Sequence, residues 1–337
     1  MSVFYLAPLE GITGYILRNA ILDIFPEGVE KVYAPFIMPH IKIPMSKKDM
    51  EDISPSHNSH GRLIPQILTN DAAGFLTLAG AMRDLGYKEI NLNLGCPSKT
   101  VASKGRGAGF LAYPKALDDF LDRIFKEDCG PISIKTRIGS DDPEEFYKLL
   151  EIYNKYPIYE LTIHPRVKTQ GYSGTPYTEL YYYALKHSTN PVCYNGDILN
   201  DMDIARLITQ CPKGAAPKDY SHTVMIGRGM IRNPGLIREL TTDKKVTSDE
   251  LMTFLKRLRT DYSSVFSGDT PVLFKMKEIW SYMRMLFPEA DKDIKKMLKC
   301  KALSEYGMYE ERILKTFNPH PVKECPPTYP AERCPKP

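Results

Sequence analysis

The fold is indicated most clearly by residues 132–165, which read ISIKTRIGSDDPEEFYKLLEIYNKYPIYELTIHP. This stretch opens with one short apolar and β-branched run, ISIKTR, and closes with another, YELTIHP, and such runs are typical of buried strands. Between them, Pro143 follows two aspartates and opens a helical pattern that reaches Tyr153, as expected for proline in the first turn of a helix. The stretch therefore predicts a strand, a helix and the next strand.

The same unit recurs along the first two thirds of the chain. Six further strand-like runs begin near Ser2, Lys31, Leu63, Glu89, Pro191 and His222, which makes eight strands in all. Helical patterns fill most of the gaps, at residues 13–25, 72–85, 113–125, 178–186, 201–208 and 233–240. Residues 38–61 are polar and interrupted, so we interpret them as a long loop.

Eight strand–helix units over about 240 residues match the size of a (β/α)8 barrel. A doubly wound sheet is the competing fold, but it usually has fewer strands and a glycine-rich first turn. This chain has A-P-L-E-G after its first strand instead. We therefore expect an α/β fold with a TIM barrel.

The pattern changes after about Asp243. Helical segments follow without intervening strands, at residues 248–266, 271–286, 291–299 and 308–317, and the end of the chain is rich in proline. We expect a catalytic barrel over residues 1–242, a small all-helical domain over 243–318 and a disordered tail over 319–337. Cys325 and Cys334 lie in that tail without the spacing of a metal site.

Composition excludes several classes of protein. Of the 337 residues, 42% are hydrophobic and 26% charged, which is the profile of a globular protein and not of a disordered one. No apolar run approaches the roughly 18 residues of a membrane helix, and the N-terminus lacks the features of a signal peptide. Seven cysteines without a C-x-x-C motif argue against a disulfide scaffold or a zinc ribbon. We expect a cytoplasmic protein that needs neither a membrane nor an obligate protein partner.

Polar side chains follow the predicted strands where each one ends, which is where (β/α)8 barrels place their active sites. Lys135 and Arg137 are two residues apart on one strand and share a face. Two cations there need an anionic or electron-rich group between them, such as the pyrimidine end of a flavin, with Gln66, His164 and Asn195 around it. Gly227-Arg228-Gly229 after the last strand suits a phosphate.

Cys96 differs from the other cysteines because it lies just beyond a predicted strand, between Gly95 and Pro97. Residues 98–109 after it are rich in glycine and basic residues, and we expect a flexible loop. A cysteine at the rim of the barrel could deliver a proton, since the reference pKa of about 8.5 keeps a thiol protonated at neutral pH. A role as nucleophile is less favoured, because no base is paired with Cys96 in the sequence.

Seven motifs, in family order, resemble the tRNA-dihydrouridine synthase family. They are A-P-L-E-G-I-T (7–13), P-Q-I-L (65–68), N-L-N-L-G-C-P-S-K-T-V (91–101), K-T-R (135–137), H-P-R-V-K-T-Q-G-Y-S-G (164–174), N-G-D-I (195–198) and I-G-R-G (226–229). The resemblance covers about residues 1–317. Leu9, Gly14 and Ala102 depart from the common family pattern and leave the subfamily open.

The resemblance implies an FMN-dependent oxidoreductase that reduces the C5–C6 double bond of a specific uridine in tRNA, with NADPH restoring the reduced flavin. It also implies that hydride reaches C6 and that Cys96 is the general acid that protonates C5. The residues implied to bind FMN are Pro8, Gln66, Lys135, His164, Asn195, Gly196, Asp197, Gly227 and Arg228. Asn93, Arg137 and Tyr172 are implied to face the uracil, and Lys99 of the basic loop is expected to bind the RNA substrate.

A basic stripe in the helical domain supports an RNA substrate. Its members are Lys292, Lys295, Lys296 and Lys299, at positions i, i+3, i+4 and i+7, with only Asp293 opposing them. Such a face can bind backbone phosphate, although it can also be an ordinary solvated surface.

Two alternative functions stay open. One is a related flavin barrel that acts on a free metabolite, such as a dihydroorotate dehydrogenase, which would not need the stripe. The other is an RNA-binding protein without catalysis, which would need neither Cys96 nor Lys135. If the protein instead reduces a uridine in folded tRNA, that base must also be unstacked from the RNA to reach the cofactor.

Overall fold

The computed structural model describes residues 2–40, 43–127, 129–215 and 222–322. The sequence predictions for Cys325, Cys334 and the rest of 323–337 lie outside the described residues. Among the described residues, no helix combines the length and the apolar character that crossing a membrane requires.

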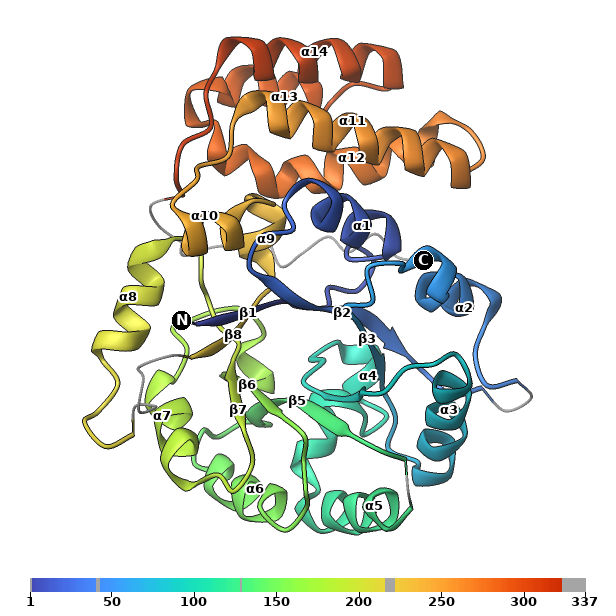
Figure 1. The fold of residues 1–337 in the computed structure, drawn as a ribbon, viewed down its shortest axis with the longest axis vertical. Helices are drawn as coiled ribbons and strands as arrows, with labels where there is room; N and C mark the ends of the chain where they lie inside the picture. The colour runs from blue at the N-terminus through green and yellow to red at the C-terminus, as the bar shows by residue number, and fades with distance from the viewer. Residues whose placement is uncertain (1, 41–42, 128, 216–221, 323–337) are drawn as a thin grey trace.

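Eight parallel strands form a closed barrel in chain order (Figure 1). They are β1 (Val3–Leu6), β2 (Val29–Ile37), β3 (Leu63–Ile67), β4 (Ile90–Leu94), β5 (Ile132–Gly139), β6 (Leu161–Val167), β7 (Val192–Tyr194) and β8 (Thr223–Ile226). The first strand pairs with the last, Val3 opposite Thr223 and Leu6 opposite Ile226, which closes the sheet. The predicted TIM barrel is confirmed.

Helices surround this barrel. They are α1 (Tyr15–Ile24), α2 (Lys47–Ile53), α3 (Ala72–Asp84), α4 (Lys99–Ala102), α5 (Pro114–Lys126), α6 (Glu145–Tyr153), α7 (Thr178–His187), α8 (Asp201–Thr209), α9 (Arg228–Arg232) and α10 (Leu236–Thr242). Local sequence sets their starts: Asp71 accepts hydrogen bonds from the N–H groups of Ala73 and Gly74 at the start of α3, and Pro114 occupies the first turn of α5.

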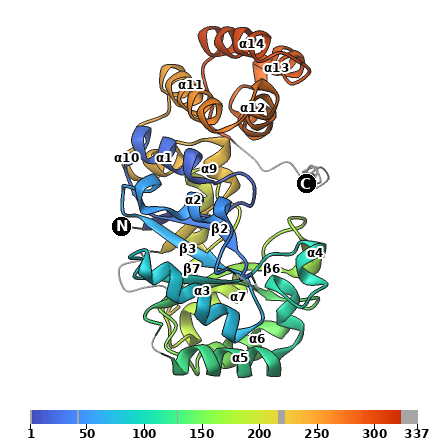
Figure 2. The same ribbon diagram turned by 90° about the vertical axis from the view of Figure 1, so that its right-hand side faces the viewer.

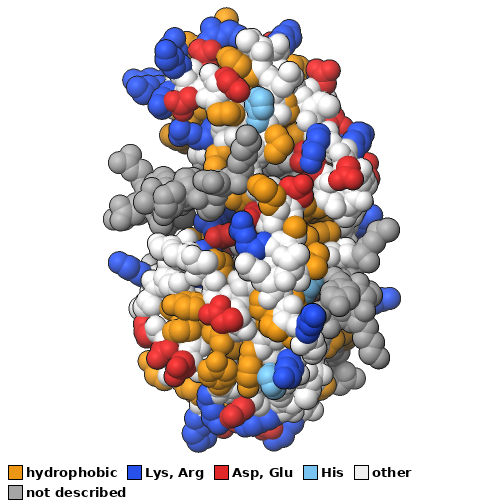
Figure 3. Space-filling model, turned by 90° about the vertical axis from the view of Figure 1, so that its left-hand side faces the viewer, with side chains coloured by type: hydrophobic (Ala, Val, Ile, Leu, Met, Phe, Trp, Pro, Cys, Tyr) orange, Lys and Arg blue, Asp and Glu red, His pale blue; other side chains and the backbone are white. Residues whose placement is uncertain are grey.

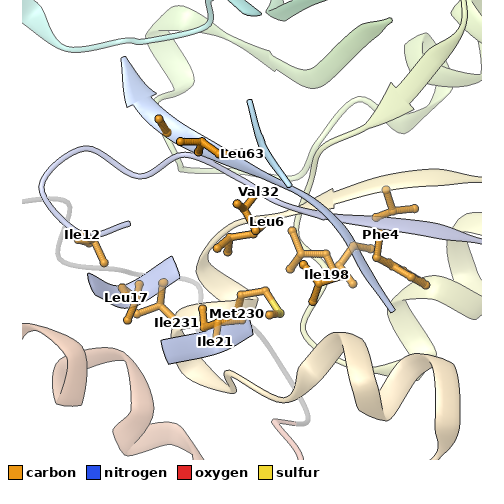
Figure 4. Packing of buried hydrophobic residues seen from close by; sticks show 14 of the residues in the cluster. Phe4, Leu6, Ile12, Leu17, Ile21, Val32, Leu63, Ile198, Met230 and Ile231 are labelled. Carbon is orange, nitrogen blue, oxygen red and sulfur yellow. The ribbon is translucent and has the colours of Figure 1, made fainter. Parts of the chain in front are cut away.

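The hydrophobic core lies between the sheet and the helices around it. Figure 4 shows Leu6 and Val32 of the strands near Ile21 of α1 and Met230 of α9, all of them buried. Burial of such side chains stabilises the fold by about 1.5–3 kcal/mol each. This packing fixes the strands, and with them the polar residues at the strand ends.

Two segments differ from the predicted loops. Residues 38–61 contain α2, whose start has a capping box between Ser46 and Asp49, and Asp52 in this helix accepts a hydrogen bond from the buried Arg18 at 3.0 Å. Residues 98–109 contain α4 and the start of a 3₁₀ helix, Gly107–Ala112, whose Phe110 is buried. Neither segment was predicted to be helical, because α2 buries only Ile53 and is held by polar capping, while residues 98–109 are rich in glycine. Neither sequence therefore repeats apolar residues at helical spacing.

Four further helices form the C-terminal region that Figures 1 and 2 show beyond the barrel. They are α11 (Ser248–Val265), α12 (Asp269–Met283), α13 (Asp291–Met297) and α14 (Leu303–Thr316). Inside this region the buried Glu310 accepts hydrogen bonds from Arg259, Trp280 and Tyr306. The helical region is confirmed, whereas its exact boundary as a domain stays a prediction.

The first residues of the predicted tail are ordered. His320 donates its backbone N–H to the carbonyl of Leu286. Val322 is buried, and its carbonyl accepts a hydrogen bond of 2.7 Å from Asn200. The prediction of disorder was therefore wrong for residues 319–322, because these contacts come from residues distant in the sequence.

Candidate active site

An open cavity of about 120 Å³ lies at the C-terminal ends of the strands. Its walls include every residue that the resemblance assigned to FMN, together with Cys96, Asn93, Arg137 and Tyr172. Residues from all eight strands or the segments directly after them therefore meet at one place. Their roles as cofactor and substrate ligands stay predictions, but their convergence is a property of the fold.

A directional chain of amides runs along one wall of the cavity. Asn93 Oδ1 accepts hydrogen bonds from the backbone N–H groups of Gly95 at 3.0 Å and Cys96 at 2.9 Å. Because N–H groups only donate, they fix the orientation of this amide. Asn93 Nδ2 then donates to Gln66 Oε1 at 2.7 Å, and Gln66 Nε2 donates to Asn91 Oδ1 at 2.7 Å. This row of hydrogen-bonded amides holds the turn that carries Cys96.

The thiol of Cys96 is half-buried and forms no disulfide with another cysteine of the described residues. Burial raises its pKa, and the charge of Glu10 acts in the same direction. A hydrogen bond to the backbone of Ser98 and the charges of Arg137 and Lys135 lower the pKa, but the net change is upward. Cys96 is therefore a thiol at neutral pH, which is the form that can donate a proton.

Lys135 and Arg137 bring two cations into the cavity from β5. Burial, and next the charge of Arg137, lower the pKa of Lys135 to about 8. Arg137 is 1% exposed and donates hydrogen bonds to the carbonyls of Gly95 at 3.0 Å and Val167 at 2.9 Å. Burial also lowers the pKa of Arg137, to about 10, so it stays charged at neutral pH. The cavity thus favours an anionic ligand.

His164 is neutral. Burial, and then the charges of Arg137, Lys135, Arg166 and Arg228, hold its pKa well below the usual range. Its Nε2 lies 3.1 Å from the guanidinium of Arg166. Since a guanidinium only donates, Nε2 must accept, and the ring proton is on Nδ1.

Asp197 binds two arginines at the far side of the cavity. Its carboxylate lies 2.7 Å from Arg166 and 2.6 Å from Arg228. Burial raises the pKa of Asp197, but the hydrogen bonds and charges of the two arginines outweigh burial and lower it. Tyr172 lies at the mouth near two guanidinium groups. The centre of its ring is 4.6 Å from the guanidinium carbon of Arg228 and 5.7 Å from that of Arg137.

Some predicted substrate residues lie outside the cavity. Lys99 is exposed at the first position of α4. The four lysines of the basic stripe are exposed too, but Lys299 lies beyond the end of α13. Lys295 forms an ion pair of 2.6 Å with Asp291, so the prediction that only Asp293 opposes the stripe was wrong. In Figure 3, Lys and Arg side chains gather over the helical region with acidic side chains among them.

Sequence reasoning missed Glu10 and Phe36 in the cavity wall. Glu10 could have been found, because it follows the first strand within A-P-L-E-G. Phe36 lies within β2 and carries no polar signal.

Most of the chain is similar to known proteins. A family model described as dihydrouridine synthase (Dus) matches residues 5–309. The chain is 28% identical over 300 residues to a tRNA-dihydrouridine(16) synthase of Shewanella oneidensis, covering 85% of this chain and 90% of the relative. It is 26% identical over 288 residues to a probable tRNA-dihydrouridine synthase 2 of Bacillus subtilis, covering 79% of each protein.

A solved structure shares the fold. Histamine dehydrogenase from Rhizobium sp. 4-9 superposes with a TM-score of 0.50 at 14% identity, covering 70% of this chain and 45% of that chain. This similarity shows the barrel alone, whereas the family model spans most of the sequence. The chain therefore belongs to the dihydrouridine synthase family of oxidoreductases.

Proposed function

We propose that this protein is a cytoplasmic tRNA-dihydrouridine synthase that reduces the C5–C6 double bond of a uridine in tRNA, with FMN as cofactor and NADPH as reductant. The observation that carries the proposal is the convergence of the Cys96 thiol with Lys135, Arg137 and the amides of Gln66 and Asn93 in one cavity. The names of the two relatives support tRNA as the substrate.

The cavity wall fits FMN in its donor chemistry. When bound, FMN would supply the hydride that reaches C6 of the uracil. Lys135 and Gln66 offer N–H donors to a ring edge that gains negative charge on reduction. Gly196 in the cavity wall packs closely against Tyr194, and only glycine fits there, since a Cβ would come within 2.1 Å of the Tyr194 hydroxyl. Arg228 offers a cation for the phosphate.

Asp197 would act on the cofactor through Arg228. Its carboxylate is already bound to Arg228 and Arg166, and a negative charge would not itself stabilise a phosphate. We assign it the task of orienting Arg228, which lines the same cavity.

Cys96 would give its proton to C5 of the uracil. The half-buried thiol is protonated at neutral pH and its turn is held by Asn93. The thiolate left after the transfer would be stabilised by Arg137 and Lys135, whose charges lower the pKa of Cys96. General acid catalysis of this kind contributes about 10²–10⁴-fold.

Arg137 and Asn93 would orient the uracil by donating hydrogen bonds. Both lone pairs of Asn93 Oδ1 are used by backbone N–H groups, so this residue can donate its second Nδ2 hydrogen to a uracil carbonyl but cannot accept from N3–H. Tyr172, which is 43% exposed between the two arginines, would cover the base from the mouth.

The test is an assay of the purified protein with NADPH and an unmodified tRNA transcript, with dihydrouridine measured by mass spectrometry. We expect dihydrouridine to accumulate at one or a few positions, and none without NADPH. Reduction of free orotate or uridine with no change in tRNA would favour the metabolite-reducing alternative. Tight tRNA binding by a protein without flavin and without product would favour the non-catalytic one.

A further inference from the structure

We propose that Arg166 is a positioning residue that holds two parts of the cavity in place together. One part is the wall formed by His164 and Asp197, and the other is the segment that carries Tyr172 at the mouth. The proposed function gives Arg166 no task. The inference rests on that function only where it assigns the wall to the cofactor and Tyr172 to the uracil.

The strand β6 places Arg166 behind the wall of the cavity. Arg166 follows His164 by two residues on β6, so the two side chains share one face of the strand. Arg166 is 1% exposed and is not one of the residues that line the cavity. It therefore acts on a ligand through its neighbours and not by direct contact.

All five N–H groups of the Arg166 guanidinium donate hydrogen bonds. Nε donates to the carbonyl of Ser173 at 3.2 Å, and Nη2 donates to the carbonyl of Gly174 at 2.6 Å. The Asp197 carboxylate accepts from Nη2 at 2.7 Å and from Nη1 at 3.3 Å. The remaining Nη1 hydrogen goes to His164 Nε2 at 3.1 Å. Because these donors lie in one rigid plane, the group cannot rotate without breaking several hydrogen bonds.

In the cavity wall, Arg166 determines how His164 and Asp197 face a ligand. His164 Nε2 accepts from Arg166, so the one N–H that the neutral ring can offer to a cofactor is on Nδ1. The same guanidinium holds the Asp197 carboxylate, which also lies 2.6 Å from Arg228. Without Arg166, the imidazole could carry its proton on either nitrogen, and Asp197 would lose its bidentate partner.

At the mouth, Arg166 anchors the segment between β6 and α7. Gly171 and Gly174 flank Tyr172 with φ angles of 56° and 65°, in the left-handed region that glycine adopts readily. Glycine also loses the most conformational freedom when it is ordered, so this segment needs contacts from outside. The carbonyls of Ser173 and Gly174, both of which Arg166 binds, tie the Tyr172 segment to β6.

One guanidinium thus joins the wall of the cavity to its mouth. A lysine would keep the charge, but its three donors are on one atom and cannot reach a carboxylate, an imidazole and two carbonyls together. The need for a planar group with five donors explains an arginine at this buried position.

The test follows the wall and the mouth separately in the protein as purified. The tautomer of His164 is read from the nitrogen NMR signals of its ring, which are assigned by their loss in His164→Gln. Hydrogen–deuterium exchange of the backbone amides of residues 169–174 reports on the mouth. In the wild type, Nδ1 should carry the ring proton at pH 7. In Arg166→Met, the ring signals should become an average of both tautomers, and exchange should be about 10- to 100-fold faster, the effect of losing a hydrogen bond to a charged group.

Two further variants make the result specific to this arginine. Arg166→Lys keeps the buried charge, and exchange of residues 169–174 should lie between the wild-type and Arg166→Met rates. Arg238 is also 1% exposed and pairs with Glu250 at 2.7 Å, but it lies on α10 outside the cavity wall. Arg238→Met should therefore lower stability and leave both readouts unchanged.

Four results would overturn the proposal. They are a proton on Nε2 of His164 in the wild type, a change in only one readout or in neither in Arg166→Met, the same changes in Arg238→Met, and wild-type exchange in Arg166→Lys. The last result decides the matter if Arg166→Met does not fold.

These readouts also separate the inference from the proposed function. If both change in Arg166→Met while the wild type forms no dihydrouridine in tRNA, the positioning role stands and the proposed function fails. If the wild type forms dihydrouridine and neither readout changes, the proposed function stands and the role of Arg166 is wrong.

Discussion

The cavity and the basic stripe on and just after α13, called the α13 surface below, both present cations, but these cations differ in burial and in ion pairing. In the described part of the chain, Arg137 is buried and Lys135 half-buried, neither has a carboxylate in ion-pair contact, and burial lowers the pKa of both. On α13, Lys295 is 63% exposed and paired with Asp291. A buried cation without a counter-ion costs stability, whereas an exposed pair contributes about 0–1 kcal/mol at most.

We interpret the cavity as a specific binding site and the α13 surface as a general electrostatic surface. An anionic ligand that binds between the two cations would account for the cost of burying them. Cations on a solvated helix need no such explanation, and they act through salt-dependent attraction. Substitutions in the cavity should therefore abolish a step, while substitutions on α13 should change affinity gradually.

The largest effect is expected for Cys96→Ala. Uridine reduction should fall by about 10²–10⁴-fold, because the general acid is lost, while NADPH should still reduce the bound flavin at a near-normal rate. Single-turnover measurements of both steps test this expectation. Cys211→Ala, which removes another partly exposed free thiol, should leave both rates unchanged. Near wild-type activity of Cys96→Ala would show that another group supplies the proton.

Lys135→Met should weaken binding of reduced FMN by about 10- to 100-fold, the contribution of a hydrogen bond to a charged group. The pKa of Lys135, about 8, also predicts a pH dependence. The side chain is charged below this value and neutral above it, so affinity should fall as the pH rises above about 8. Titration of the reduced flavin against pH measures both effects.

A control variant and the pH profile both test this account of Lys135. Lys88→Met is a matched control, because Lys88 is exposed ahead of β4, at the opposite end of the barrel, and it should leave the affinity intact. A pH profile of Lys135→Met identical to that of the wild type would assign the titration to another group.

Asn93→Ala should lower the free energy of unfolding by about 1–3 kcal/mol, because two backbone N–H groups at the Cys96 turn lose their acceptor. Asn70 is a suitable control, since its exposed amide donates to the carbonyl of Lys104 and Asn70→Ala should cost about 0.5 kcal/mol or less. Urea denaturation of the FMN-loaded proteins gives both values. Equal losses would mean that Asn93 does not support the turn.

The smallest effect is expected for the α13 surface. Replacing Lys292, Lys296 and Lys299 with Gln should lower the slope of log affinity for tRNA against log salt by about two to three, a little under one for each phosphate contact. FMN content should not change. A further Lys295→Gln substitution should lower this slope by less than each of the other three, because Lys295 is paired with Asp291.

A charge-matched variant tests whether location matters. Lys115, Lys126 and Lys148 lie on α5 and α6 at the outside of the barrel, and their replacement by Gln removes the same charge. Its salt slope should change by less than one. If both triple variants behave alike, the α13 lysines form only a solvated face.

The fold was predictable where a pattern repeats. Eight apolar runs gave eight strands because each buried strand needs a continuous apolar stretch. The helix α2 was missed, since of its residues only Ile53 is buried and it is held by capping and by Arg18. Residues 319–322 were misjudged because their partners, Asn200 and Leu286, are remote in the sequence.

The site was predictable from position and less so from partners. Polar residues at strand ends converge in a barrel, so Cys96, Lys135 and His164 could be placed in one cavity. The sequence could not show that Asp197 binds Arg166 and Arg228, because such pairing depends on side-chain distances between elements that are separate in the sequence. The pair of Lys295 with Asp291 is different: the two residues are four apart on α13, so spacing along the chain could have predicted it.

A single-turnover experiment tests the central claim most directly. The FMN-loaded protein is reduced without oxygen, excess reductant is removed, and an unmodified tRNA transcript is added while flavin absorbance and dihydrouridine are followed together. We predict that the flavin is reoxidised and that one dihydrouridine forms for each flavin oxidised. Reoxidation without dihydrouridine, or no reoxidation on addition of tRNA, would contradict the claim that this cavity reduces uridine.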